Sequence, residues 1–466
     1  MSHPNPIGST AQFRGLLRSL VLDPQLLFHQ VLSTDHIVSA VTDVAGQTCD
    51  RVYTPLVTLA LFLSQILDDD PTCRAAVARL LAWRCAEGKS SCSPDTGAYC
   101  KARLRLPEAL LPRLVRDTAD RLQGHAPETW LFHGRAVTLV DGTTVSMPDT
   151  PENQAAYPQH ANQEPGCGFP IARILVLISL ATGAVLDAAI GPRKGKLSGE
   201  STLLRGLHER LRRGDILLGD RVFCSYFEVA LLSAQGVDVV LRDHKNRPVD
   251  FRKGRRLGDD DHLVEWRKPQ RASWMDPETY ATIADTITVR ELRVRVVQRG
   301  FRTRVLIVMT TLLDPEEFTH DELADLYRAR WYAELDLRSI KQTLKMDVLR
   351  CKTPEMVRKE IWGHLLATNV IRGVMAEAAR RHEVLPRQLS FQGARQTMEA
   401  FRGELSHASP VAAERLREEA LKAIARHRVG NRPDRIEPRV RKRRPKAYPL
   451  MHEARAKARK RLERAA

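Results

Sequence analysis

The order of strand-like and helix-like segments between residues 136 and 243 constrains the fold of this 466-residue chain more than any other feature. Apolar and alternating runs predict strands, and longer amphipathic runs predict helices. The predicted strands are 136–140, 172–181, 184–191, 215–220 and 237–243, and the predicted helices are 199–213 and 225–236. Strands that come first in hairpins and then alternate with helices indicate an α/β fold, a mixed sheet with helices packed on it.

The pattern breaks at about residues 243–312, where a charged loop is followed by three more alternating segments that read as strands. A long helix is predicted from near Asp321 to beyond Lys345, and further helices fill the chain to about residue 425. We therefore expect one catalytic-type domain over residues 126–425, with a β-rich insertion at about 243–312 and C-terminal helices from about 346.

The first 125 residues read as helical. Two helix-start signals, Asp70-Pro71 and Ser93-Pro94-Asp95, each combine a capping side chain with a proline at the first helical position. The two helices that follow could form a helix-turn-helix that binds DNA, or an ordinary helical bundle with a basic rim. Three basic residues lie on or just past the second helix: Lys101, Arg103 and Arg105.

The charge of the chain is concentrated at its C-terminal end. The net charge is +17, and residues 426–466 hold 16 Lys or Arg against 4 acids. Such a basic tail is typical of an arm that binds nucleic acid, although an anionic membrane or a purely solubilising role are alternatives. The N-terminus lacks a signal-peptide pattern, and the longest apolar run, 174–180, is too short to cross a bilayer. We therefore expect a cytoplasmic protein without a membrane partner.

Four polar residues on the long predicted helix share one face. Tyr327, Arg330, Glu334 and Lys341 are spaced by three, four and seven residues, which places them in an arc of roughly 60° on an ideal helix. One carboxylate thus lies between cations on a helix that also has an apolar side. The alternative is a solvated face with an ordinary Arg330–Glu334 pair.

Two more carboxylates follow predicted strands. Asp141 comes after the first strand, where Asp-Gly could also be a hairpin turn, and Asp220 comes after the fourth, where it could also cap a helix. If both meet Glu334 at one edge of the sheet, their mutual repulsion favours divalent cations. Two Mg²⁺ ions, or Mn²⁺ instead, could serve a phosphoryl transfer there, with Arg221 beside them for the DNA backbone.

The order of the three acids and the spacing of the four helix residues resemble the DDE transposases of bacterial insertion sequences. More narrowly, they resemble the insertion-sequence-four family, whose signature is Tyr, two residues, Arg, three residues, Glu, six residues, Lys. The segment GDILLGDRVFCSYF is similar to the second-acid motif of that family, and NRPDRIEPRVRKRRPKAYPLM is similar to its C-terminal segments. The resemblance covers about residues 15–450.

The resemblance implies an RNase-H-like core interrupted by a β-rich insertion before the glutamate helix, and cut-and-paste DNA transposition. Asp141, Asp220 and Glu334 would hold the metal and cleave DNA at the element's ends, after which the freed 3′-OH attacks target DNA. Tyr327, Arg330 and Lys341 would contact phosphates, and a homodimer would bring two ends together. A DNA-binding inhibitor of transposition and a metal-dependent nuclease of the same fold remain alternatives.

One feature departs from the family pattern. A relative stacks a flipped base on a tryptophan in the strand that leads to the glutamate helix, and the corresponding segment here, RTRVLIVMTTL, has no aromatic residue. Trp266 or Trp274, elsewhere in the insertion, could serve instead, or could simply pack in the core.

Overall fold

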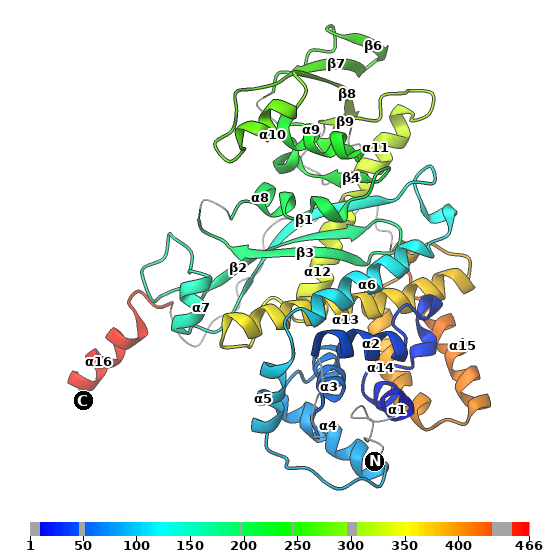
Figure 1. Cartoon of the computed structure of the whole chain (residues 1–466), viewed down its shortest axis with the longest axis vertical. Helices are drawn as coiled ribbons and strands as arrows, with labels where there is room; N and C mark the ends of the chain where they lie inside the picture. Colours follow the sequence, from blue (N-terminus) through cyan, green and yellow to red (C-terminus); the bar gives the residue numbers. More distant parts are fainter. Residues whose placement is uncertain are drawn as a thin grey trace. The chain divides into compact units, whose positions relative to one another are not determined.

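Figure 1 shows the computed structural model of the chain, which describes residues 10–45, 52–195, 198–244, 247–295, 305–430 and 450–465. The chain divides into two compact units. Unit 1 consists of Met1–Gly134, Ile178–Asp187 and Leu335–Val429, and unit 2 consists of Arg135–Leu177, Ala188–Glu334 and Gly430–Ala466. The middle of the predicted basic tail, 431–449, lies outside the described residues.

A nine-stranded sheet has the order β3-β2-β1-β4-β5-β9-β8-β7-β6. Strands β1, β4 and β5 run parallel to one another, and the pairs from β5 through β9, β8 and β7 to β6 are antiparallel. Every strand predicted from the sequence is present, which confirms the mixed α/β sheet. The strands are β1 Val137–Ser146, β2 Ile171–Ser179, β3 Val185–Pro192, β4 Ile216–Gly219, β5 Asp238–Arg242, β6 Arg255–Gly258, β7 Asp261–Arg267, β8 Thr286–Arg295 and β9 Val305–Thr310.

The predicted β-rich insertion extends this sheet. Strand β9 returns beside β5 with Val240 opposite Thr310, and β8 and β7 pair outward from it. The sequence analysis missed the short strand β6 and the helix α10 (Pro277–Thr282). The sequence did not predict strand β6, because this segment has only four residues, begins with two arginines and shows no strand period.

Short helices accompany the strands of unit 2. The helix predicted over 199–213 is wrong in its length: α8 spans only Glu200–Arg205, Gly206 follows it, and a 3₁₀ turn, η4, covers His208–Arg210. Helix α9 (Tyr226–Gln235) begins where Ser225 Oγ accepts from Glu228 N, and ends at Gly236 with a left-handed φ of 80°. The other helices there are α7 Pro151–Ala156 and α11 His320–Ala329, with α16 Arg455–Ala465 near the C-terminus.

Unit 1 is built around α13 (Pro354–Arg381), a 28-residue helix that packs against α3, α6, α14 and α15. Almost every residue of α13 is buried, as expected for a helix surrounded by others. No helix in the described part of the chain is both long and apolar enough to cross a membrane. The remaining helices are α1 Thr10–Leu20, α2 Thr34–Ala45, α3 Pro55–Leu67, α4 Cys73–Ala86, α5 Gly97–Arg105, α6 Leu110–Gly124, α14 Phe391–His407 and α15 Pro410–Arg426.

The predicted helix starts near residues 70 and 93 need correction. Helix α4 is capped by Thr72, whose Oγ1 accepts from Ala75 N, while Asp70 Oδ1 accepts from the Thr72 amide. Helix α5 begins after Thr96, which makes no side-chain capping bond. Arg103 also turns inward, because its guanidinium lies over the rings of Phe62 and Tyr99. Arg103 is therefore partly buried within unit 1 and is not part of a basic rim.

Buried ion pairs tie the helices of unit 1 together. The carboxylate of Asp336, only 4% exposed, accepts hydrogen bonds from Arg372 and, at 2.6 Å, from Arg387. Arg387 also donates to the carbonyl oxygens of Ser179 and Leu180, each at 2.7 Å. Two guanidinium groups share this one carboxylate, and Arg387 places its remaining donors on main-chain carbonyl oxygens, so the buried charges are hydrogen-bonded rather than isolated.

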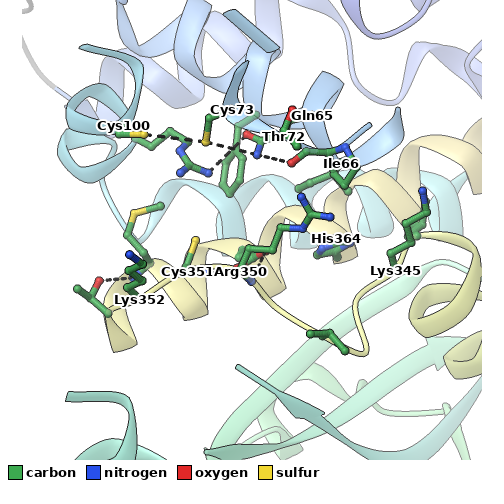
Figure 2. A pocket seen from close by; sticks show the side chains of 18 of the residues that line it. Gln65, Ile66, Thr72, Cys73, Cys100, Lys345, Arg350, Cys351, Lys352 and His364 are labelled. Atoms are coloured by element: carbon green, nitrogen blue, oxygen red, sulfur yellow. Dashed lines mark hydrogen bonds between the residues drawn. The ribbon is translucent and has the colours of Figure 1, made fainter. Parts of the chain in front are cut away.

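A cavity of about 710 Å³ lies within unit 1 (Figure 2). It is lined by α3, the start of α4, α5, residues 344–353 and α13, and the lining is predominantly apolar. The thiols of Cys73 and Cys100 face one another there at 3.9 Å, and the buried His364 has no hydrogen-bond partner at Nδ1. None of the acids that the sequence predicts as catalytic lines this cavity.

Candidate active site

The two aspartates of the predicted triad lie side by side on the sheet of unit 2. Strands β1 and β4 are parallel, with Leu139 paired to Leu218. Asp141 and Asp220 each lie two residues beyond that pair, so both lie at the same level of the sheet, Asp141 within β1 and Asp220 just after β4. Parallel neighbours are about 4.8 Å apart, which brings the two carboxylates within reach of one metal-binding site. The convergence predicted for this pair is thus supported by the strand register.

Asp141 is not at a hairpin turn, because β1 continues through it to Ser146. Its half-buried carboxylate accepts from the Gly142 amide at 2.8 Å. Burial is the main cause that raises the pKa of Asp141 to about 6, and the charges of Glu334 and Glu200 add to it. The Gly142 hydrogen bond and the charge of Arg330 act in the opposite direction.

Asp220 directly precedes the 3₁₀ turn η5 (Arg221–Phe223) in the N-cap position, but its side chain makes no capping hydrogen bond. The alternative reading of Asp220 as a helix cap therefore lacks its defining contact. Arg221 is exposed on the same turn. Both residues remain available for chemistry at this level of the sheet.

Glu334 lies on α12 (Trp331–Arg338), which follows α11 after a break at Arg330. The single long helix predicted here is wrong: Arg330 N donates to Tyr327 O and Ala333 N donates to Arg330 O, both contacts three residues apart. This tighter turn separates two α-helices. Arg330 Nη2 reaches Glu334 Oε1 at 2.9 Å, so the ion pair expected from their spacing is present.

Arg330 is the positive centre of the site. Burial lowers its pKa, but the combined effect of Tyr327, Glu334 and Asp220 raises it above its usual value. Tyr327 is 4% exposed, and burial first, with the charge of Asp220 adding, raises the pKa of its hydroxyl well above the usual range. Asp141, Asp220 and Glu334 therefore all interact with one guanidinium.

Lys341 belongs to unit 1, on the π-helical turn η6 (Ser339–Thr343). A π turn has more residues per turn than an α-helix, so the uniform stripe predicted from Tyr327 to Lys341 does not extend to its last member. The role of Lys341 remains a prediction from the sequence signature.

Sequence reasoning missed one charged residue at the site. Glu200, the first residue of α8, lies close enough to Asp141 for its charge to raise the pKa of that carboxyl group. The only sequence signal was an acid at a helix start after the third strand, which ordinarily indicates a favourable helix dipole.

The donor atoms of the site are all carboxylate oxygens, the ligands that Mg²⁺ and Mn²⁺ prefer. Within the described ranges, no three His, Cys, Asp or Glu side chains lie close enough together to form a ready-made metal site. The Arg330–Glu334 ion pair gives a physical reason, because it turns the Glu334 carboxylate onto a guanidinium. The residue types fit a divalent cation. To bind it, Glu334 would release the guanidinium of Arg330.

The two tryptophans considered for base stacking differ. Trp266 is 8% exposed, its Nε1 donates to Glu291 at 3.0 Å, and the Arg247 guanidinium lies 3.4 Å from its ring centroid. It is a core residue. Trp274 is 42% exposed, with the guanidinium of Arg205 3.7 Å from its ring centroid.

Comparison with known proteins identifies the family of the chain. A family model described as "Transposase DDE domain" matches residues 132–370. The chain is 30% identical over 362 residues to transposase InsG for insertion sequence element IS4 of Escherichia coli (strain K12), covering 76% of this chain and 77% of the relative. It is also 35% identical over 69 residues to the transposase for insertion sequence element IS421 of Escherichia coli, covering 15% of this chain and 19% of the relative.

Among solved structures, a cryo-EM structure of the piggyBac transposase synaptic complex with hairpin DNA matches with a TM-score of 0.41 and 10% identity, over 88% of this chain and 85% of that one. This similarity is too low to establish a shared fold. The family model and the IS4 relative together cover the three acids and the Tyr-Arg-Glu-Lys spacing. The chain belongs to the DDE transposases, in the family of insertion sequence element IS4.

Proposed function

We propose that Asp141, Asp220 and Glu334 are the catalytic carboxylates with which this DDE transposase cleaves DNA and transfers the cut strand. The observation that carries the proposal is the register of β1 and β4, which puts Asp141 and Asp220 at the same level of two neighbouring parallel strands. Glu334 is linked to the same group through Arg330, whose charge interacts with both aspartates.

The family depends on divalent metal ions, and we propose that the three carboxylates hold two Mg²⁺ ions, with Mn²⁺ as a substitute. When bound, these ions supply Lewis-acid stabilisation of the attacking and leaving oxygens of the phosphoryl transfer. The raised pKa of Asp141 supports this assignment, since a buried carboxyl group among like charges gains from a nearby cation.

The basic and phenolic side chains around the acids would hold the DNA backbone. With Glu334 among the residues that would hold the cation, the guanidinium of Arg330 would be able to donate two parallel hydrogen bonds to a phosphate. Tyr327 keeps its proton because its pKa is raised, so its hydroxyl can donate to a phosphate oxygen. The exposed Arg221 would contact the DNA backbone, and Lys341 would contact another phosphate.

The substrates would be double-stranded DNA at the element's ends and target DNA, in a homodimeric complex. The parallel order β1, β4, β5 with helical connections supports an RNase-H-like core within residues 126–425. We assign DNA binding to residues 1–125 and to the basic tail 426–466, and the bacterial cytoplasm as the place of action.

The first experiment is cleavage of labelled DNA that carries the element's ends, in Mg²⁺, by the wild type and by Glu334→Ala. We expect the variant to bind DNA but to cleave roughly 10³-fold more slowly, because loss of a metal carboxylate removes several kcal/mol of transition-state stabilisation. Glu316→Ala, an exposed acid before α11, is the matched control and should cleave normally.

Full cleavage by Glu334→Ala would refute the assignment of the third acid. If neither protein cleaves although both bind the ends, the inhibitor hypothesis replaces the transposition mechanism. Cleavage of any DNA without strand transfer would favour the nuclease hypothesis.

A further inference from the structure

Glu200 packs directly on the main chain next to Asp141. A Cβ atom placed on Gly142 would lie 2.8 Å from Glu200 Oε1 and 2.9 Å from its Cδ, closer than real Cβ contacts allow. The Glu200 carboxyl group therefore occupies the space that any side chain at position 142 would need. Two elements that are distant in the sequence, β1 and α8, are brought together by this contact.

The ion pair between Arg173 and Glu200 is loose: Nε and Oε1 are 3.9 Å apart, which is too long for a hydrogen bond. Arg173 instead donates through Nη1 to the carbonyl oxygen of Ser198 at 2.7 Å, and its buried Nε has no hydrogen-bond partner. The carboxyl group of Glu200 is 29% exposed, so it can adjust toward a ligand at the site.

We infer that Glu200 is a fourth carboxylate of the active site, which strengthens the binding of a divalent cation on the side of Asp141. The inference rests on the proposed function, because it takes Asp141, Asp220 and Glu334 as the primary cation site. Among the described residues, Arg330 pairs with Glu334 and Arg173 lies 3.9 Å from Glu200, so four carboxylates carry more negative charge than these two cations offset, and a divalent cation would balance it. Mg²⁺ usually keeps several waters, so Glu200 can act through them without displacing a primary ligand.

The test is Mn²⁺ binding to the full-length protein without DNA, followed by electron paramagnetic resonance, for the wild type and Glu200→Gln. We expect Mn²⁺ affinity to fall about 10-fold or more, as for other residues that support metal ligands. Cleavage should fall in parallel and recover at higher Mg²⁺. Glu209→Gln, an exposed acid on η4, makes the same charge change and should leave both unaltered.

Gly142→Ala is a second test variant. It keeps Glu200 in the sequence, but the added methyl group would displace the Glu200 carboxyl group. We expect it to weaken Mn²⁺ binding as Glu200→Gln does, and the double variant to be no weaker than either single one, since both remove one contact. If Glu200→Gln folds and binds Mn²⁺ as tightly as the wild type does, the inference is wrong.

Asp141→Asn and Asp220→Asn separate this inference from the proposed function. If these variants lose Mn²⁺ binding and Glu200→Gln does not, only the role of Glu200 is wrong. If Asp141→Asn and Asp220→Asn both keep it, the proposed cation site itself is wrong, and the inference falls with it.

Discussion

Two aspartates, the buried Asp336 in unit 1 and the half-buried Asp141 in unit 2, have opposite electrostatic surroundings. Asp336 lies between the guanidinium groups of Arg372 and Arg387. Asp141 has Glu334 and Glu200 as neighbours, and the Gly142 hydrogen bond and the charge of Arg330 partly offset them. The comparison shows that the structural carboxylate Asp336 is paired within the protein, whereas the carboxylate of Asp141, proposed for catalysis, lies among like charges.

The largest expected difference in stability comes from removing the two aspartates in turn. Asp336→Ala should lower the free energy of unfolding of unit 1 by about 3–5 kcal/mol, because it leaves two buried guanidinium groups without a carboxylate. Asp141→Asn should leave the stability unchanged or raise it, because it removes a buried charge from among like charges. Denaturant unfolding monitored by circular dichroism measures both.

Glu404→Ala, which removes an exposed acid on α14, is the control and should lie within about 0.5 kcal/mol of the wild type. The comparison would fail if Asp336→Ala cost no more than this control, or if Asp141→Asn proved the more destabilising of the pair.

A smaller effect concerns pH. Burial lowers the pKa of His364, in α13, from its ordinary 6.5 to about 3, so between these values the unfolded chain binds the extra proton. Stability of unit 1 should therefore fall as the pH drops below 6.5, by up to about 1.4 kcal/mol per pH unit. Asp141 acts oppositely, since its raised pKa makes the native state the better proton acceptor below about pH 6.

Urea unfolding between pH 7.5 and 4.5 tests this, with His364→Gln expected to flatten the dependence. His382, which follows the end of α13, provides the control through His382→Gln. Equal slopes for His364→Gln and the wild type would show that His364 does not supply the acid sensitivity.

The smallest expected effect compares two N-cap residues. Thr72→Ala should destabilise α4 by about 1 kcal/mol, because it removes the hydrogen bond to Ala75 N. Asp220→Asn should cost nothing through capping, because Asp220 makes no such bond, although it should abolish cleavage. Melting temperatures of the two variants distinguish a capping residue from a catalytic one. A marked loss of stability in Asp220→Asn would show that Asp220 has a structural role.

The sequence predicted the strands well because period-2 and apolar patterns are local, and all the predicted strands appear. The order of the acids, the helix spacing and the second-acid segment also resembled the family, and the comparisons confirm that assignment. The sequence did not predict the break at Arg330 or the π turn at Lys341, because residues 321–345 are uniformly compatible with helix. Hydrogen-bond geometry at those points is set by tertiary packing.

The electrostatics of the site lay beyond sequence reasoning for a related reason. The register of Leu139 with Leu218 and the contact of Glu200 with Gly142 join distant segments, and neither leaves a local signal. Burial likewise could not be read from the sequence at Arg103 and Trp266. Arg103 was expected on a basic surface but packs over the ring of Phe62. Trp266 was a candidate for base stacking but is buried. The catalytic assignments of the three acids and the domain boundaries stay predictions.

The discontinuity of unit 1 has a consequence for synthesis on the ribosome. The helices before Gly134 emerge first, but α13, on which α3 and α6 pack, follows roughly 200 residues later. At about 5–20 residues per second, that delay is on the order of 10–40 s. During it α3, with 11 of its 13 residues destined for the interior, has no partner in α13. The apolar residues of α3 that pack on α13 therefore stay uncovered by that helix until the second half of the core has been translated.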